Sequence, residues 1–207
     1  MRARGKGVLT LVVAGVVALG AASFERLGDR EPAAPVPGTA TSATWLCPHG
    51  GGKAYEGAVY LANPGEAEVL ARVTGLSADG PSSSSDVVVP AGSQVEVEVA
   101  ATDRSSSTFV ETFGGWLAAG WLVRGAQGQV GIGVEPCAAE PGRAWVSAGA
   151  GTGEGDDAFL VVMNPYEADA VFDVALFSAE RAPVRDSELT DLTLRPRRSM
   201  AIQLNEF

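Results

Sequence analysis

The sequence has few of the residues on which most catalytic and metal sites depend. It contains one histidine, two cysteines and two lysines among 207 residues. A tetrahedral zinc site draws on about four Cys or His ligands, and the chain holds only three such side chains. A nucleophilic mechanism with an imidazole base would have to use His49, which lies beside three glycines. We therefore expect no catalytic residue, no metal site and no cofactor.

Positive charge is also scarce. The chain carries 15 Lys and Arg against 25 Asp and Glu, a formal net charge of −10. Binding to nucleic acid relies on a basic face that displaces counterions from phosphates, so nucleic acid is excluded as a partner. Only 19% of the residues are charged and 46% are hydrophobic, which excludes a disordered polyelectrolyte. The composition favours a folded domain with an acidic surface.

A long apolar run occurs near the N-terminus. Residues 7–24 carry no charge, and Arg2, Arg4 and Lys6 precede them. As a helix this run nearly crosses the roughly 30 Å hydrocarbon core, and the cations before it keep the N-terminus in the cytoplasm. We predict that residues 1–24 are a signal anchor, a single transmembrane helix at the cell membrane with the C-terminal domain extracellular. A cleaved signal peptide and a secreted protein are the alternative.

Strand periodicity dominates the rest of the chain. Residues 25–44 read as a Pro/Ala-rich linker, and residues 45–207 as the ectodomain. The string QVEVEV at 94–99 alternates valine with polar side chains, which is typical of a half-buried strand. Asn63-Pro64-Gly65 is a turn signal between two such runs. No apolar stripe of helical period follows residue 24, so the expected fold class is all-β.

The ectodomain also repeats itself. Trp45 and Trp145 are 100 residues apart, and Asn63-Pro64 and Asn164-Pro165 are 101 apart. A Pro-x-x-Ser turn recurs at an offset of 106, where Pro90 begins the first and Pro196 the second. Turn chemistry repeated at nearly constant spacing indicates an internal repeat. The two halves are residues 45–100 and 145–207, and 101–144 is an unduplicated middle segment.

The repeat predicts the architecture. We expect an antiparallel β-sandwich built from two related halves (a pseudo-repeat), with the hairpins of residues 101–144 between them. Trp45 and Trp145 occupy equivalent positions and are expected to anchor the core. The half at 145–207 lacks a counterpart of the middle segment, so we expect that it cannot close a sandwich alone. This favours one composite domain, 45–207, over two independent domains.

Several motifs together resemble a known family. They are Trp45-Leu46-Cys47-Pro48, the Asn-Pro turns at Asn63 and Asn164, and Glu135-Pro136-Cys137. They resemble an actinobacterial family of uncharacterised, single-pass, exported β-proteins, classed as a domain of unknown function. The resemblance covers about residues 45–207 together with the N-terminal anchor. It implies a membrane-anchored exported protein, and it implies no enzymatic role.

The two cysteines are Cys47 and Cys137. An even number in an oxidising compartment predicts one disulfide, and this bond would close a loop of 90 residues. Two free thiols, or a redox pair, are the alternatives.

Two glycine-rich strings need an interpretation. The string HGGGK at 49–53 lacks the spacing and the following helix of a phosphate loop, so we expect a flexible loop beside the disulfide. The string GTGEGDD at 151–157 gathers three carboxylates without the spacing of a dedicated calcium loop. We expect a solvated hairpin loop there.

Trp116 and Trp121 flank a short apolar run, in what the pattern predicts to be a hairpin. Burial in the sandwich core is the preferred interpretation, and a surface platform for sugar rings is the alternative.

Three functions remain open. The first is a non-catalytic, membrane-tethered cell-envelope protein that binds or scaffolds an envelope protein partner. The second is a carbohydrate-binding module that uses Trp116 or Trp121 to bind a glycan. The third is a hydrolase with paired carboxylates such as Glu111 and Glu135, which require a separation of about 5–10 Å.

Overall fold

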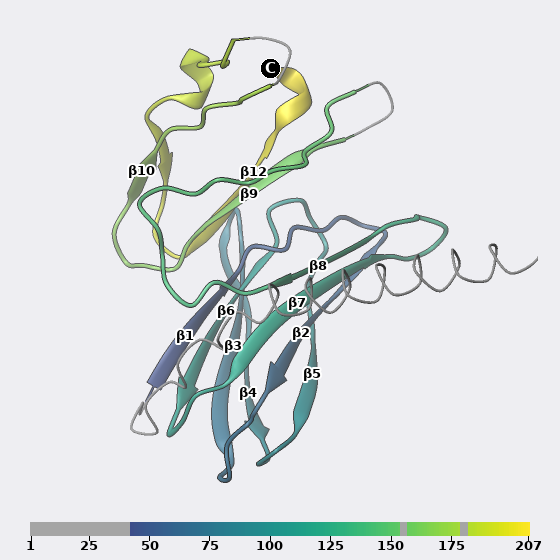
Figure 1. Cartoon of the computed structure of the whole chain (residues 1–207), viewed down its shortest axis with the longest axis vertical. Coiled ribbons are helices and arrows are strands. Elements are labelled where there is room, and N and C mark those ends of the chain that lie inside the picture. The colour runs from purple at the N-terminus through teal and green to yellow at the C-terminus, as the bar shows by residue number, and fades with distance from the viewer. Residues whose placement is uncertain (1–41, 154–156, 179–181) are drawn as a thin grey trace, which may run out of the picture. The chain divides into compact units, whose positions relative to one another are not determined.

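The computed structural model describes residues 42–153, 157–178 and 182–207, which all belong to one compact unit (Figure 1). The predicted signal anchor at 1–24 and nearly all of the predicted linker lie outside the described residues. Among the residues that are described, no helix is long and apolar enough to span a membrane.

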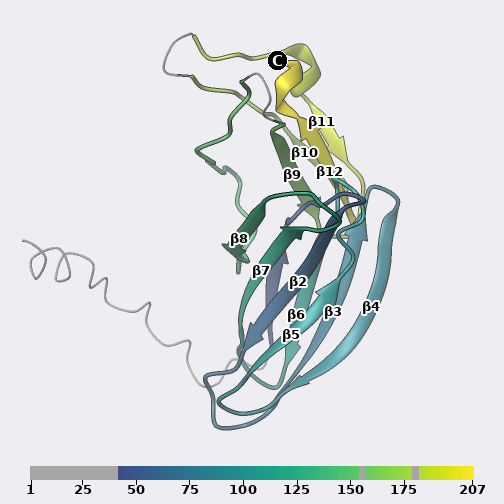
Figure 2. The same ribbon diagram turned by 90° about the vertical axis from the view of Figure 1, so that its right-hand side faces the viewer.

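The all-β prediction is confirmed. The first eight strands form two antiparallel sheets of four strands each (Figure 1, Figure 2). In sheet order, the first sheet contains β1 (Ser42–Cys47), β6 (Ser107–Phe113), β3 (Val69–Ser77) and β4 (Gly80–Val89). The second sheet contains β5 (Gln94–Val99), β2 (Tyr55–Ala62), β7 (Ala118–Gly125) and β8 (Ile132–Pro136).

Alternation along the strands places the core between these two sheets. On β5 the valines are half-buried and the glutamates exposed, because successive side chains of a strand point to opposite faces. Val59 and Leu61 of one sheet and Val110 of the other are fully buried at 0% exposure, in one continuous cluster. The layers therefore pack face to face as a sandwich, which we call the first sandwich (residues 42–136).

The composition of this sandwich differs from the prediction. We expected strands of residues 45–100 and 145–207 to share it, but β1 to β8 all lie before residue 137. The middle segment supplies β6, β7 and β8 instead of joining two halves. The predicted hairpin around Trp116 is also wrong. β6 and β7 belong to different sheets, so the chain crosses between the layers at residues 114–117.

The remaining strands form the C-terminal lobe (residues 157–207, described without 179–181). β9 (Phe159–Asn164) pairs with β12 (Arg198–Gln203), and β10 (Ala170–Phe172) pairs with β11 (Leu192–Leu194). Two short 3-10 helices, η1 (Ser187–Leu189) and η2 (Leu204–Glu206), complete it.

The lobe contacts the first sandwich through side chains of β9 and β12. Met163 packs against the apolar cluster of Leu46, Leu76 and Phe109. The Arg198 guanidinium donates to the carbonyl oxygen of Ala78 at 2.7 Å, and the Ser199 hydroxyl donates to the carbonyl of Ser105.

The two repeated tryptophans have different environments. Trp45 lies on β1 and packs against the core of the first sandwich, whereas Trp145 is 69% exposed. The expectation that Trp145 anchors a core is therefore wrong. β1 is a strand because β6 pairs with it, and among the described residues no strand pairs with residues 142–147.

Candidate functional site

The side chain of Asn63 holds the turn that follows β2. Its Nδ2 donates to the carbonyl oxygens of Ala67, at 2.8 Å, and Val89, at 3.0 Å. Its Oδ1 accepts from the backbone N–H of Gly65 at 2.9 Å. The residue is 2% exposed, so its amide satisfies buried backbone groups that water cannot reach.

Asn164 makes the corresponding bonds after β9. Its Nδ2 donates to Ala168 at 2.8 Å and to Leu194 at 3.1 Å, and its Oδ1 accepts from the N–H of Tyr166 at 3.1 Å. Asn164 is also 2% exposed. Each partner lies 101 or 105 residues after its equivalent at the first turn.

Strand register follows the same two offsets. Val69 pairs with Val89 on β3 and β4, and Ala170 pairs with Leu194 on β10 and β11. The β2–β5 pair and the β9–β12 pair show the same offsets. Ala62 is opposite Gln94, and Met163 is opposite Ser199, which are 101 and 105 residues later.

The backbone of the following turn agrees as well. Gly92 has φ 61° and Arg197, 105 residues later, has φ 52°. Each donates its N–H back to the Asn turn, Gly92 to Gly65 at 3.1 Å and Arg197 to Tyr166 at 3.0 Å. The structural offset of this turn is therefore 105, one less than the Pro-x-x-Ser match suggests.

The two regions differ in what covers these strands. Val59 and Leu61 of β2 are 0% exposed, whereas Leu160 and Val162, at the same positions of β9, are only partly buried. In the first sandwich β7 pairs with the second edge of β2, and β6 pairs with the second edge of β3. Among the described residues, β9 and β10 have one paired neighbour each.

A second unpaired edge belongs to the first sandwich. In the described part of the chain, β8 pairs with β7 on one side and with no strand on the other. Ile132 and Val134 project from the same face of β8, 71% and 62% exposed, and Val130 just before them is 92% exposed. Gly133, between the two, faces the ring of Trp121 beneath. Apolar side chains therefore line an open edge of the sheet.

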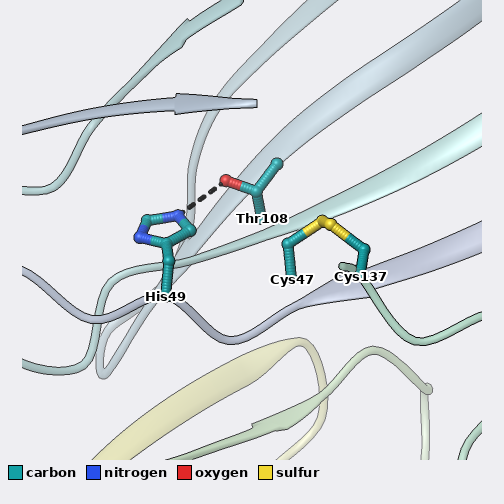
Figure 3. Close-up of a disulfide and its surroundings, with 4 residues drawn as sticks. All are labelled: Cys47, His49, Thr108 and Cys137. Atoms are coloured by element: carbon teal, nitrogen blue, oxygen red, sulfur yellow. Dashed lines mark hydrogen bonds between the residues drawn. A yellow bond between two sulfur atoms is a disulfide. The ribbon is translucent and has the colours of Figure 1, made fainter. Parts of the chain in front are cut away.

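The disulfide prediction is confirmed. Cys47 and Cys137 are bonded, with their Cα atoms 4.6 Å apart (Figure 3). Cys47 ends β1 in one sheet, and Cys137 follows β8 in the other. The bond therefore joins the two layers and stabilises the first sandwich.

His49 lies beside this disulfide and is 7% exposed (Figure 3). Its Nδ1 donates to the carbonyl of Gly50 at 2.7 Å, because a carbonyl only accepts. The other ring nitrogen, Nε2, then accepts from the Thr108 hydroxyl at 2.9 Å. Burial lowers the pKa of His49, and the bond to the Gly50 carbonyl opposes that shift. The imidazole is thus neutral and engaged in two structural bonds.

The glycine string after His49 is anchored, which differs from the flexible loop we expected. The N–H of Gly50 donates to Ser106 at 2.7 Å, and that of Gly52 donates to Ala101 at 2.8 Å. A side chain at Gly51 would begin 2.3 Å from the carbonyl oxygen of Ala101, so the close approach of these backbones requires glycine there.

The two candidate sugar-binding tryptophans differ in their surroundings. Trp121 is 8% exposed within the core cluster, and its ring centroid is 6.3 Å from that of His49. Trp116 is partly buried and meets Trp45 edge to face at 5.9 Å. A buried ring has no open face for a sugar, so Trp121 serves the sandwich core.

Carboxylates offer no assembled centre among the described residues. No group of three or more His, Cys, Asp or Glu lies close enough there to hold a metal ion. Glu111 is on β6 and Glu135 is on β8, which belong to different sheets. The carboxylate loop at 151–157 lies partly outside the described residues.

The unpaired edge of β8 is the feature that the sequence did not indicate. Val130, Ile132 and Val134 alternate with glycine and read as an ordinary strand. Their exposure depends on which strands share a sheet, and strand pairing is a non-local property. For β10 a signal was present, since the second half lacks a counterpart of the middle segment.

Comparison with known proteins identifies the family to which the chain belongs. No curated protein matches the chain. A solved structure described as "Crystal Structure of Thermotoga maritima 1070" aligns with 13% identity and a TM-score of 0.41, over 47% of this chain and 94% of that one. Residues 37–206 match a family of unknown function, DUF5719. The expected membership in an uncharacterised family is thereby confirmed, and the chain belongs to DUF5719.

Proposed function

We propose that this protein is a non-catalytic, membrane-tethered module of the cell envelope that binds a protein partner. The observation that carries the proposal is the apolar open edge of β8, where Ile132 is 71% and Val134 is 62% exposed. An exposed edge strand offers unpaired backbone groups to another chain, and exposed apolar side chains beside it favour a protein ligand over a soluble polar one.

The envelope location rests on the N-terminal sequence. The uncharged run at 7–24 with cations before it favours an exported domain, and the disulfide is compatible with an oxidising compartment. The resemblance to exported actinobacterial proteins supports the same location.

We also infer that the C-terminal lobe is a shorter second copy of the framework made by β2 to β5. The matched bonds of Asn63 and Asn164 support this inference, as do the shared registers. Under this interpretation the pseudo-repeat lies in the pairing of these strands and excludes the middle segment.

Photo-crosslinking in intact cells tests the proposed function. A photoreactive amino acid replaces Ile132 in the full-length chain, and a second one replaces Ala91, an exposed turn residue, as the control. We expect the probe at 132 to capture one protein in near-stoichiometric yield, and Val134→Lys to abolish this product. Equal patterns at both positions, or products with glycan alone, would contradict a protein partner at β8.

A glycan remains the second candidate ligand, with Trp116 as its partly buried platform. Retention of the full-length chain on cell-wall glycan, lost in Trp116→Ala at unchanged melting temperature, would favour it.

A further inference from the structure

β10 uses only one of its two edges. In the first sandwich β3 pairs with β4 on one side and with β6 on the other. β10 has the register of β3, and within the described part of the chain it pairs with β11 alone. A free edge presents N–H and C=O groups that accept a further strand, so β10 lacks the neighbour that β6 provides to β3.

The inner face of β10 is also incompletely covered. Val69 and Ala71 of β3 are 4% and 0% exposed, in a core cluster that includes Val110 of the neighbouring strand β6. Ala170 and Phe172, at the same positions of β10, are only partly buried. A strand added at the β6 position would remove apolar surface of both residues from water, which stabilises the added strand.

The charge at this edge differs from that of the first sandwich. Arg72 of β3 forms an ion pair with Asp86 at 2.8 Å and lies opposite Glu111 of β6. The residues at the equivalent positions are both acidic, namely Asp173 and Asp191. The N–H of Asp191 donates to the carboxylate of Asp173 at 2.7 Å. Two carboxylates thus occupy the place of an ion pair, and the described residues provide no cation to either.

We propose that β10 accepts an extended segment of the protein partner as an added antiparallel strand in the position equivalent to β6. The segment carries apolar side chains at alternate positions toward Ala170 and Phe172, and a lysine or arginine opposite Asp173. This inference rests on the proposed function, because it assigns the partner a second contact, and it concerns a different edge from β8.

A second copy of this chain fits the edge poorly. Its own β6 places Glu111 at the position that would oppose Asp173, and like charges directly opposite each other destabilise a strand pair. That β6 is also buried in its own sandwich, with Val110 at 0% exposure. The charge of β10 therefore favours a basic partner segment.

Two peptides test the proposal on the full-length chain in detergent micelles. One has the sequence of residues 106–114, and the other carries Glu111→Lys within it. We expect the lysine peptide to bind about fivefold more tightly, as an exposed opposite-charge pair replaces a like-charge pair. Its binding should also slow amide hydrogen exchange at residues 170–173.

Two variants of the protein test whether the carboxylate of Asp173 causes the preference for the lysine peptide. Asp173→Asn keeps an oxygen acceptor for the N–H of Asp191 and removes the charge, so both peptides should bind it equally. Glu98→Gln makes the same chemical change on the exposed edge strand β5 and should leave the fivefold preference intact.

Three results would overturn the proposal: no binding of either peptide, equal binding to the unmodified chain, or an unchanged preference in Asp173→Asn. None of them bears on the cross-link at Ile132, which tests the proposed function separately. A cross-link without peptide binding would leave a protein partner at β8 and remove the one at β10.

Discussion

The turns at Asn63 and Asn164 share three internal bonds in different surroundings. Each asparagine is 2% exposed and binds three backbone groups at matching offsets. The strand before the first turn has the fully buried side chains Val59 and Leu61, whereas their counterparts before the second turn are only partly buried. Local turn chemistry is therefore independent of the layers around it. Burial depends on β6 and β7, which have no counterpart among the described residues of the C-terminal lobe.

The disulfide gives the largest expected contrast between the regions, because it joins the two sheets of the first sandwich. Its loop of 90 residues is worth about 4–5 kcal/mol in the chain-entropy model. We expect Cys47→Ser with Cys137→Ser to lower the free energy of unfolding of the first sandwich by this amount. Local hydrogen exchange in β10 and β11 should change little. Denaturant unfolding followed by exchange mass spectrometry measures both, and equal destabilisation of both regions would contradict the contrast.

Truncation of an apolar side chain should cost more free energy on β2 than on β9, because the side chains of β2 are more deeply buried. Leu61 is 0% exposed, and Val162 at the same position of β9 is partly buried. We expect Leu61→Ala to cost about 3 kcal/mol and Val162→Ala about 1 kcal/mol, since the cost of truncation grows with lost contacts and the cavity left. Chemical denaturation of the two variants compares them, and a Val162→Ala cost as large as that of Leu61→Ala would mean that β9 is as well packed as β2.

Substitution of the two turn asparagines should cost a similar free energy in both regions. Asn63→Ala removes three bonds and Asn164→Ala removes the three equivalent bonds together with one from Nδ2 to the carbonyl of Arg195 at 3.2 Å. Both changes leave buried carbonyls without donors, which should cost about 2 kcal/mol in either case. Local opening free energies from native-state hydrogen exchange around each turn test this. Asn63→Asp and Asn164→Asp are matched controls that keep one acceptor and lose the Nδ2 donor. A large loss at one turn only would mean that the two networks are not equivalent.

The sequence predicts the local features well. Alternation identified β5, the Asn-Pro signals located both turns, and the cysteine count predicted the disulfide. Each of these depends on residues close in the chain or on the compartment.

The pairing of strands could not be predicted in the same way. β6 and β7 follow each other closely in sequence, as the two strands of a hairpin do. They nevertheless lie in different sheets, and nothing in their periodicity indicates this. Trp145 is exposed because no described strand pairs with residues 142–147, and one bond of His49 is to Thr108, 59 residues away. The open edges of the candidate site follow from the same non-local pairing.

The smallest expected effect is a pH dependence confined to the first sandwich. The folded pKa of His49 lies below its ordinary value of 6.5, because burial disfavours the imidazolium. The unfolded chain therefore binds the proton more strongly, so this stability is complete above pH 6.5 and declines as the pH falls toward the folded pKa. We expect the melting temperature to fall as the pH is lowered below 6.5, and His49→Gln to flatten that slope. A slope unchanged in the variant would assign the dependence to other groups.

Native-state hydrogen exchange of the full-length chain tests the central claim, that the C-terminal lobe repeats the β3–β4 pairing with one edge open. The amides of residues 69–73 on β3 are compared with those of residues 170–174 at the same positions. We predict that every second amide of the second segment exchanges at least tenfold faster than its counterpart, because no strand among the described residues covers that edge of β10. Equal protection of the two segments in the isolated chain would contradict the claim.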